Sequence, residues 1–173
     1  MNRQQYAHLP TDVLNLIVGR MLAFTEEYDD DITMMFWHLK ILGFKTLVLP
    51  PHAEGKYWGR AHICSNGKYI ESEIWIHKTP TTKSQAIILG HEVGHVIIDT
   101  SPNFCAHRLR SKFTGDDLHA YGVILEEIVE TFAVKWVTKR GVYEQIVTLL
   151  ESFKKTGEVT AYVSGYCRMP EWA

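Results

Sequence analysis

The chain has few cysteines and no long apolar run, and these absences exclude several classes of protein. Its 173 residues include three cysteines, Cys64, Cys105 and Cys167, without a Cys-x-x-Cys pair. Neither a disulfide framework nor a cysteine-based metal site is therefore predicted. No run of about 18 apolar residues occurs, and the polar first residues do not resemble a signal peptide. We expect a protein of the reducing cytoplasm that makes no contact with a membrane.

An excess of charge of one sign is also lacking. The 18 basic and 20 acidic residues give a formal net charge of -2. A protein that binds nucleic acid mainly through its phosphates carries a broad positive field, so we expect no direct binding of nucleic acid. The sequence is 46% hydrophobic, which is enough to form a core, and no repeat or Ser/Gly/Pro-rich linker divides it. A single domain over residues 1–173 is expected.

The first half of the chain predicts helices followed by a small sheet. Residues 1–43 predict two helices, of which the second covers residues 34–42 and ends at Gly43. Residues 44–78 predict the sheet, because they are rich in β-branched and aromatic residues. Its strands are expected over residues 45–49, 57–64 and 69–77.

An Asn-Gly pair at positions 66 and 67 lies between the last two expected strands and favours a hairpin there. The second half of the chain predicts helices again. Beyond Pro80, residues 82–157 predict helices over about 82–99, 116–139 and 142–155. The order of helices, small mainly antiparallel sheet and helices indicates an α+β fold.

A His-Glu-x-x-His pattern over residues 91–95 is the most informative motif. On a helix, His91 and His95 lie one turn apart on the same face, so both imidazoles can reach one zinc ion, and Glu92 can reach a water bound to that ion. The two histidines share the polar face, opposite an apolar stripe. Gly94 lies inside this helix, where glycine is unfavourable, and so predicts that another segment approaches closely.

A third metal ligand is expected within a later helix. Glu126 lies well inside the apolar arc of this helix, with Glu130 one turn on, whereas Glu127 lies on its solvent face. Burying a carboxylate is costly unless its charge is compensated, and a metal does this directly. We therefore assign Glu126 as the third ligand and Glu130 as the acceptor for a ring N–H of a ligand histidine. The reverse assignment, and buried salt bridges with Arg108 or Arg110, are the alternatives.

Two histidines, one carboxylate and a neighbouring glutamate indicate hydrolysis of an amide bond. Zinc lowers the pKa of bound water, and Glu92 would take a proton from this water and return it to the leaving nitrogen. The developing oxyanion needs a further donor. The candidates are His107, His119 and Tyr121, with a packing or surface role as the alternative for each.

With these motifs the sequence resembles the zincin metallopeptidases and, among them, the ImmA/IrrE metallopeptidase family. The resemblance rests on the apolar run that leads into His91-Glu92-Val93-Gly94-His95 and on the Glu126-x-x-Val129-x-x-Phe132-Ala133 segment. Val129 replaces the usual alanine, and Asp99 stands where many members have a further histidine. The matching region covers roughly residues 45–140.

This resemblance implies a zincin-like metallopeptidase domain that holds one Zn²⁺ per chain. It also implies a zinc-dependent endopeptidase that cuts a specific protein substrate, often a transcriptional repressor, and an extended substrate that pairs with an edge strand, here assigned to residues 71–77. Two other functions stay open. One is a non-proteolytic, zinc-containing regulatory or binding protein, and the other is a metal-free interaction protein with a coincidental motif.

Overall fold

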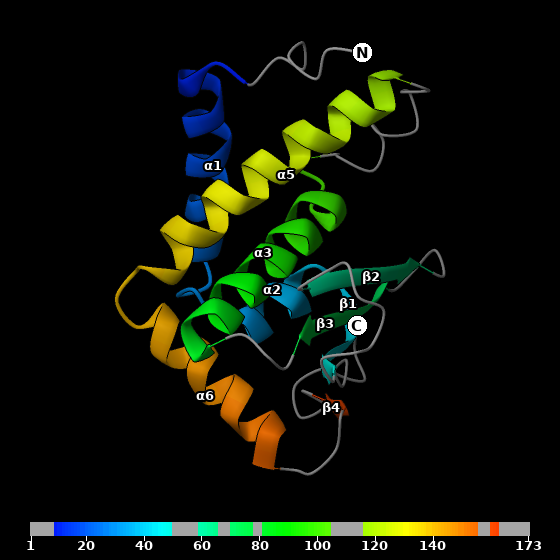
Figure 1. Cartoon of the computed structure of the whole chain (residues 1–173), viewed down its shortest axis with the longest axis vertical. Coiled ribbons are helices and arrows are strands. Elements are labelled where there is room, and N and C mark those ends of the chain that lie inside the picture. The colour runs from blue at the N-terminus through cyan, green and yellow to red at the C-terminus, as the bar shows by residue number, and fades with distance from the viewer. Residues whose placement is uncertain are drawn as a thin grey trace.

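The computed structural model describes residues 9–49, 59–65, 70–77, 81–104, 116–155 and 160–162 (Figure 1). The described helices are α1 (Thr11–Glu26), α2 (Ile32–His38), α3 (Thr82–Thr100), α5 (Asp116–Val137) and α6 (Val142–Lys155). The strands are β1 (Ile41–Leu49), β2 (Gly59–Ser65), β3 (Ile70–His77) and β4 (Thr160–Tyr162). The expected α+β class is confirmed. Among the described residues, no helix has both the length and the apolar composition that a membrane crossing requires.

The sheet is mixed, with the strand order β2-β3-β1-β4. β2 and β3 are antiparallel neighbours, as the hairpin prediction requires, although the Asn66-Gly67 turn itself lies outside the described residues. β4 is also antiparallel to β1, but the longest pairing, between β1 and β3, is parallel. Two of the three described pairings are antiparallel, in line with the expectation, but the parallel pairing was not expected, because strand propensity does not show which strand of the hairpin will pair with β1.

The boundary between α2 and β1 also differs from the prediction. The helix ends at His38 rather than at residue 42, and β1 already begins at Ile41. Lys40, with φ of 59°, makes a left-handed turn directly after the helix, whereas the helix was expected to end at Gly43. Ile41 is only 2% exposed, so burial of a β-branched side chain in the sheet outweighs continuation of the helix.

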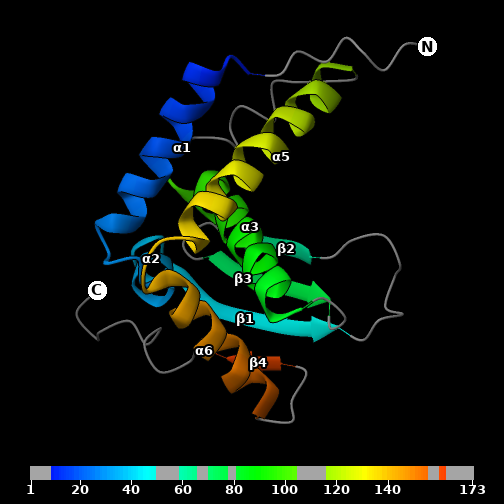
Figure 2. The ribbon, with the colours of Figure 1, turned by 60° about the vertical axis from the view of Figure 1, so that its left-hand side comes forward.

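The motif helix α3 lies between the sheet and the other long helix, α5 (Figures 1 and 2). Its N-terminus is capped by Thr81, whose hydroxyl accepts a hydrogen bond from the backbone N–H of Ser84 at 3.3 Å. The apolar stripe predicted for this helix is buried in the core. It consists of Ala86, Leu89, Gly90, Val93 and Ile97.

Two glycines let α5 lie close against α3. A Cβ added to Gly94 would lie 3.0 Å from Cδ1 of Phe132, and one added to Gly90 would lie 2.7 Å from Cγ2 of Val137. The close approach predicted from Gly94 is therefore confirmed, and the approaching segment is α5. Gly94 meets Phe132, whereas Gly90, which is earlier on α3, meets Val137, which is later on α5. The two helices therefore run antiparallel.

A polar cluster fixes the far end of α5 to the turn between α1 and α2. The indole N–H of Trp136 donates to Oδ1 of Asp30 at 2.9 Å, and Nζ of Lys139 lies 2.7 Å from Oδ2 of the same carboxylate. Lys139 also pairs with Glu26 on α1 at 3.0 Å. The helix that carries the expected third ligand is thus held both by α3 and by the amino-terminal helices.

Candidate metal centre

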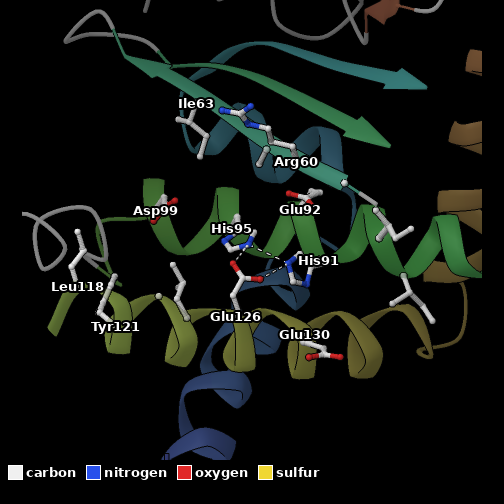
Figure 3. Close-up of a pocket in the computed structure, with 16 residues that line it drawn as sticks. Arg60, Ile63, His91, Glu92, His95, Asp99, Leu118, Tyr121, Glu126 and Glu130 are labelled. Atoms are coloured by element: carbon white, nitrogen blue, oxygen red, sulfur yellow. Dashed lines mark hydrogen bonds and ion pairs between the residues drawn. The ribbon is translucent and has the colours of Figure 1, made fainter. Parts of the chain in front are cut away.

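Three side chains expected to bind one metal converge at the contact between α3 and α5. Nε2 of His91 lies 3.2 Å from Oε2 of Glu126, and Nε2 of His95 lies 3.3 Å from Oε1 of Glu126. The two Nε2 atoms lie 3.2 Å from each other. His91, His95 and Glu126, called the donor triangle below, thus offer ligand atoms that all lie within 4.8 Å of one another, and the group could hold a metal ion (Figure 3).

The fold explains why these three residues meet. His91 and His95 are four residues apart on α3, so their rings point to the same side, with ring centroids 4.9 Å apart. Glu126 comes from α5, one turn before the Val129 side chain that packs against Gly94. The close contact at Gly94 therefore sets the distance from the carboxylate to both imidazoles.

The carboxylate is more exposed than the sequence suggested. The side chain of Glu126 is 60% exposed, whereas those of His91 and His95 are 24% and 16% exposed. Glu126 lies on the face of α5 that meets α3, with the buried Val129, as expected, but its expected burial is wrong because the side chain reaches into an open cleft. Hydrogen bonds from His91 and His95 hold the pKa of Glu126 well below its usual range. Burial lowers the pKa of His95, but the hydrogen bond and charge of Glu126 outweigh this effect and raise it.

Glu92 lies beside the triangle but deeper in the protein. Only 5% of the residue is exposed. Burial raises the pKa of its carboxyl group, while His91, His95 and hydrogen bonding from the backbone N–H of Ala61 partly offset this increase. A carboxylate with a raised pKa is better suited to accept a proton and to return it.

The donor triangle opens into a cleft of about 930 Å³. Its walls come from β2, α3 and α5, and Figure 3 shows Arg60 and Glu92 on one side of the histidines and Glu126 on the other. The strand that forms a wall is β2 and not the segment 71–77. That segment belongs to β3, which lies between β2 and β1, so its expected role as an edge strand is wrong.

The other acidic residues near the motif occupy three different environments. Glu130 lines the cleft and is exposed, and Figure 3 shows its carboxylate turned away from the histidines. The structure records no contact of Glu130 with either imidazole, so its expected role as acceptor for a ligand ring lacks structural support. Glu127, expected on the solvent face, is half-buried and accepts a hydrogen bond from the backbone N–H of Leu9 at 3.4 Å. Asp99 lines the cleft, and its charge contributes to the raised pKa of His95.

The three candidate oxyanion donors are not equally placed. Tyr121 is half-buried and lines the cleft from α5. His119 is exposed and does not contribute to the cleft lining. His107 lies outside the described residues, as do Arg108 and Arg110, the partners in the salt-bridge alternative for Glu126. Tyr121 is therefore the candidate that the described structure places in the cleft.

The sequence reasoning missed the contribution of β2 to the site. Gly59, Arg60, Ala61 and Ile63 all line the cleft, and Ala61 contacts the carboxylate of Glu92. The available signal was Gly59 itself, because a glycine within a strand often marks the close approach of another segment. Without knowledge of the strand order, this glycine could not be assigned to the site.

Comparison with known proteins adds no assignment to this geometry. Searches of protein-family models, curated proteins and solved structures found no significant match to the chain.

Proposed function

We propose that the protein is a zinc-dependent endopeptidase. The observation that carries the proposal is the donor triangle of His91, His95 and Glu126: the two Nε2 atoms lie 3.2 Å apart, and each lies 3.2 or 3.3 Å from one of the two carboxylate oxygens. Ligand atoms about 2.0–2.1 Å from a tetrahedral zinc ion are about 3.3 Å from one another. The two histidine nitrogens already have this separation, and each carboxylate oxygen has it from one of these nitrogens, which supports zinc binding here. Three protein ligands leave the fourth position open, as catalytic zinc sites do.

The chemistry divides between the metal and Glu92. When bound, zinc lowers the pKa of a coordinated water toward about 7 and polarises a carbonyl group. Glu92 adjoins His91 and is buried, so it accepts the proton of the attacking water without competition from bulk solvent. The protonated carboxyl group then donates to the leaving nitrogen. One residue serves first as base and then as acid.

The cleft suits an extended polypeptide. β2 is an edge strand of the described sheet and forms one wall of the cleft. Its Ala61 N–H is engaged by Glu92, so a substrate strand would pair with other backbone groups of this edge. Tyr121 on the opposite wall is the proposed donor to the developing oxyanion. These features support an endopeptidase rather than a hydrolase of small molecules.

The resemblance to the ImmA/IrrE metallopeptidases supports a narrow substrate range. We propose that the substrate is one particular protein of the cytoplasm, in keeping with relatives that cleave a transcriptional repressor. The near-neutral charge of the chain favours recognition of this protein over direct contact with DNA.

The test is cleavage of a peptide library derived from a whole proteome, with new amino termini identified by mass spectrometry. The zinc-loaded wild type is compared with Glu92→Gln, which keeps the metal ligands and removes the base. Cleavages at a consistent motif that disappear in Glu92→Gln and on chelation are expected. Equal cleavage by both proteins would exclude Glu92 as the base. Stoichiometric zinc without any cleavage would favour a non-proteolytic zinc protein, and absence of zinc binding would favour a metal-free interaction protein.

A further inference from the structure

The amino-terminal end of β2 lies directly against the part of α3 that carries Glu92. A Cβ added to Gly59 would lie 2.6 Å from Oε1 of Glu92 and 2.5 Å from Cγ2 of Ile88. Both distances are far below the usual van der Waals contact between such atoms, about 3.5 Å. Any side chain at position 59 would therefore occupy the space of the carboxylate.

The same strand also holds the carboxylate from a second position. The backbone N–H of Ala61, two residues after Gly59, provides hydrogen bonding to Glu92. Residues two apart on a strand lie on the same side of it, so Gly59 and Ala61 both face α3. The strand thus supplies both the space for the carboxylate and a donor to it.

Backbone conformation does not explain the glycine at position 59. Its φ lies outside the left-handed range that favours glycine, unlike that of Gly141, whose φ is +87°. A glycine in a strand also forgoes side-chain packing and costs conformational entropy. The remaining requirement at this position is space, and this space is filled by Cγ2 of Ile88 and by the carboxylate of Glu92.

We propose that Gly59 is a positioning residue for the general base, because the lack of a side chain there lets Glu92 lie against β2 with its carboxylate facing Ala61. This inference rests on the proposed function of Glu92. An added methyl group would displace the carboxylate more readily than the backbone, since the end of a glutamate side chain is flexible and a strand is not. The three atoms nearest to a Cβ at position 59 belong to Ile88 and Glu92 and not to the donor triangle, so we expect the metal ligands to stay in place.

The first test needs neither metal nor substrate. Hydrogen exchange of the Ala61 amide is measured by NMR in the metal-free full-length wild type and in Gly59→Ala. We expect exchange to become about tenfold faster in Gly59→Ala, because the amide loses its acceptor. Glu92→Ala should give the same increase, whereas Glu92→Gln keeps an acceptor oxygen and should restore protection. The matched control is Gly19→Ala, because a Cβ there meets nothing within 4 Å.

The second test measures function in the zinc-loaded protein. With a peptide identified by the library screen, Gly59→Ala should lower kcat about a hundredfold and leave KM and zinc content near their wild-type values. A variant that only loosened the fold would instead lower zinc content or thermal stability. Gly19→Ala should keep wild-type kcat, KM and zinc content.

The outcomes separate this inference from the proposed function. Unchanged Ala61 exchange in a folded Gly59→Ala protein would overturn the positioning role, whatever the protein catalyses. Faster exchange in a protein that hydrolyses no peptide would keep the contact and reject the endopeptidase. Should Gly59→Ala fail to fold, the double variant Gly59→Ala with Ile88→Ala removes the 2.5 Å contact and leaves only the one with Glu92. Wild-type exchange at Ala61 in that folded double variant would also overturn the inference.

Discussion

Gly94 on α3 and Phe132 on α5 face each other so closely that a methyl group on Gly94 would lie 3.0 Å from Cδ1 of the phenylalanine ring. This contact sets the separation of the two helices at the height of the donor triangle. The imidazoles on one helix and the carboxylate on the other can meet only at this separation. The glycine of the His-Glu-x-x-His motif therefore acts in site assembly, although it binds nothing itself.

Replacement of this glycine should weaken both folding and metal binding. We expect Gly94→Ala to lower the free energy of unfolding by about 1–2 kcal/mol, because overpacking against Phe132 outweighs the better helix propensity of alanine. The same change at Gly19, where a Cβ meets no atom within 4 Å, should raise it by roughly 0.5–1 kcal/mol. Urea unfolding of the two metal-free variants measures both values. Equal effects at the two positions would contradict the role of the helix contact.

The three members of the donor triangle should each be required for zinc. His91→Ala, His95→Ala and Glu126→Ala are expected to weaken zinc binding on the order of a hundredfold or more, as each removes one of three protein ligands. Glu130→Ala should bind zinc like the wild type, because no contact of Glu130 with the histidines is recorded. Competition with a chelating dye, followed by elemental analysis, measures the affinities. Tight zinc binding by Glu126→Ala would move the third ligand to another residue.

Replacement of Tyr121 tests its proposed role as the donor to the oxyanion. If its hydroxyl donates to the developing oxyanion, Tyr121→Phe should lower kcat about a hundredfold while zinc content and KM stay near wild type. His119→Ala serves as the control on the same helix, since His119 does not line the cleft. Steady-state kinetics on a peptide from the library screen measure both variants. A wild-type kcat in Tyr121→Phe would exclude the tyrosine as the donor.

Asp30 should make the stability of the protein dependent on pH in acid. Burial raises the pKa of its carboxyl group, but hydrogen bonds from Lys139, Thr25 and Trp136 outweigh this effect, and the net shift is downward. A group whose pKa is lower in the folded state stabilises the protein above its unfolded pKa, about 3.9, and loses this contribution as the pH falls through the folded value.

The matching experiment compares Asp30→Asn with Asp29→Asn, a neighbour that also has a positive φ but is exposed. We expect Asp30→Asn to lower the unfolding free energy by about 1–2 kcal/mol at pH 7, and by less at pH 3. Asp29→Asn should change it little at either pH. Urea midpoints at the two pH values provide the comparison. A deficit in Asp30→Asn that does not shrink in acid would contradict the ionic role of this carboxylate.

Much of the fold could be predicted from local patterns, and the errors arose where tertiary contacts decide. The face of α3 that carries His91 and His95 and the face that packs in the core were predicted correctly, because both follow from helical periodicity. The end of α2 was misplaced because burial of Ile41 in the sheet outweighs the stop signal of Gly43. Periodicity alone could not provide such long-range information.

The candidate site shows the same difference between local patterns, which could be predicted, and long-range contacts, which could not. The spacing of His91 and His95 is a local property, so the sequence predicted their convergence. The convergence of Glu126 with them agrees with the assignment, although the reason given for it, burial of its carboxylate, was wrong. The wall formed by β2 was missed, because the order of strands in a mixed sheet depends on pairings that no short pattern encodes.

The distribution of the donor atoms over two helices links metal occupancy to chain topology. His91 and His95 lie on α3, and Glu126 lies about thirty positions later on α5, so the proposed ion would join distant segments much as a disulfide would. Such a link closes a loop that the unfolded chain must leave open, and it can be removed by a chelator without chemical reduction. Release of the proposed ion would therefore remove one link between α3 and α5, and the packing of Gly94 against Phe132 would remain as the other.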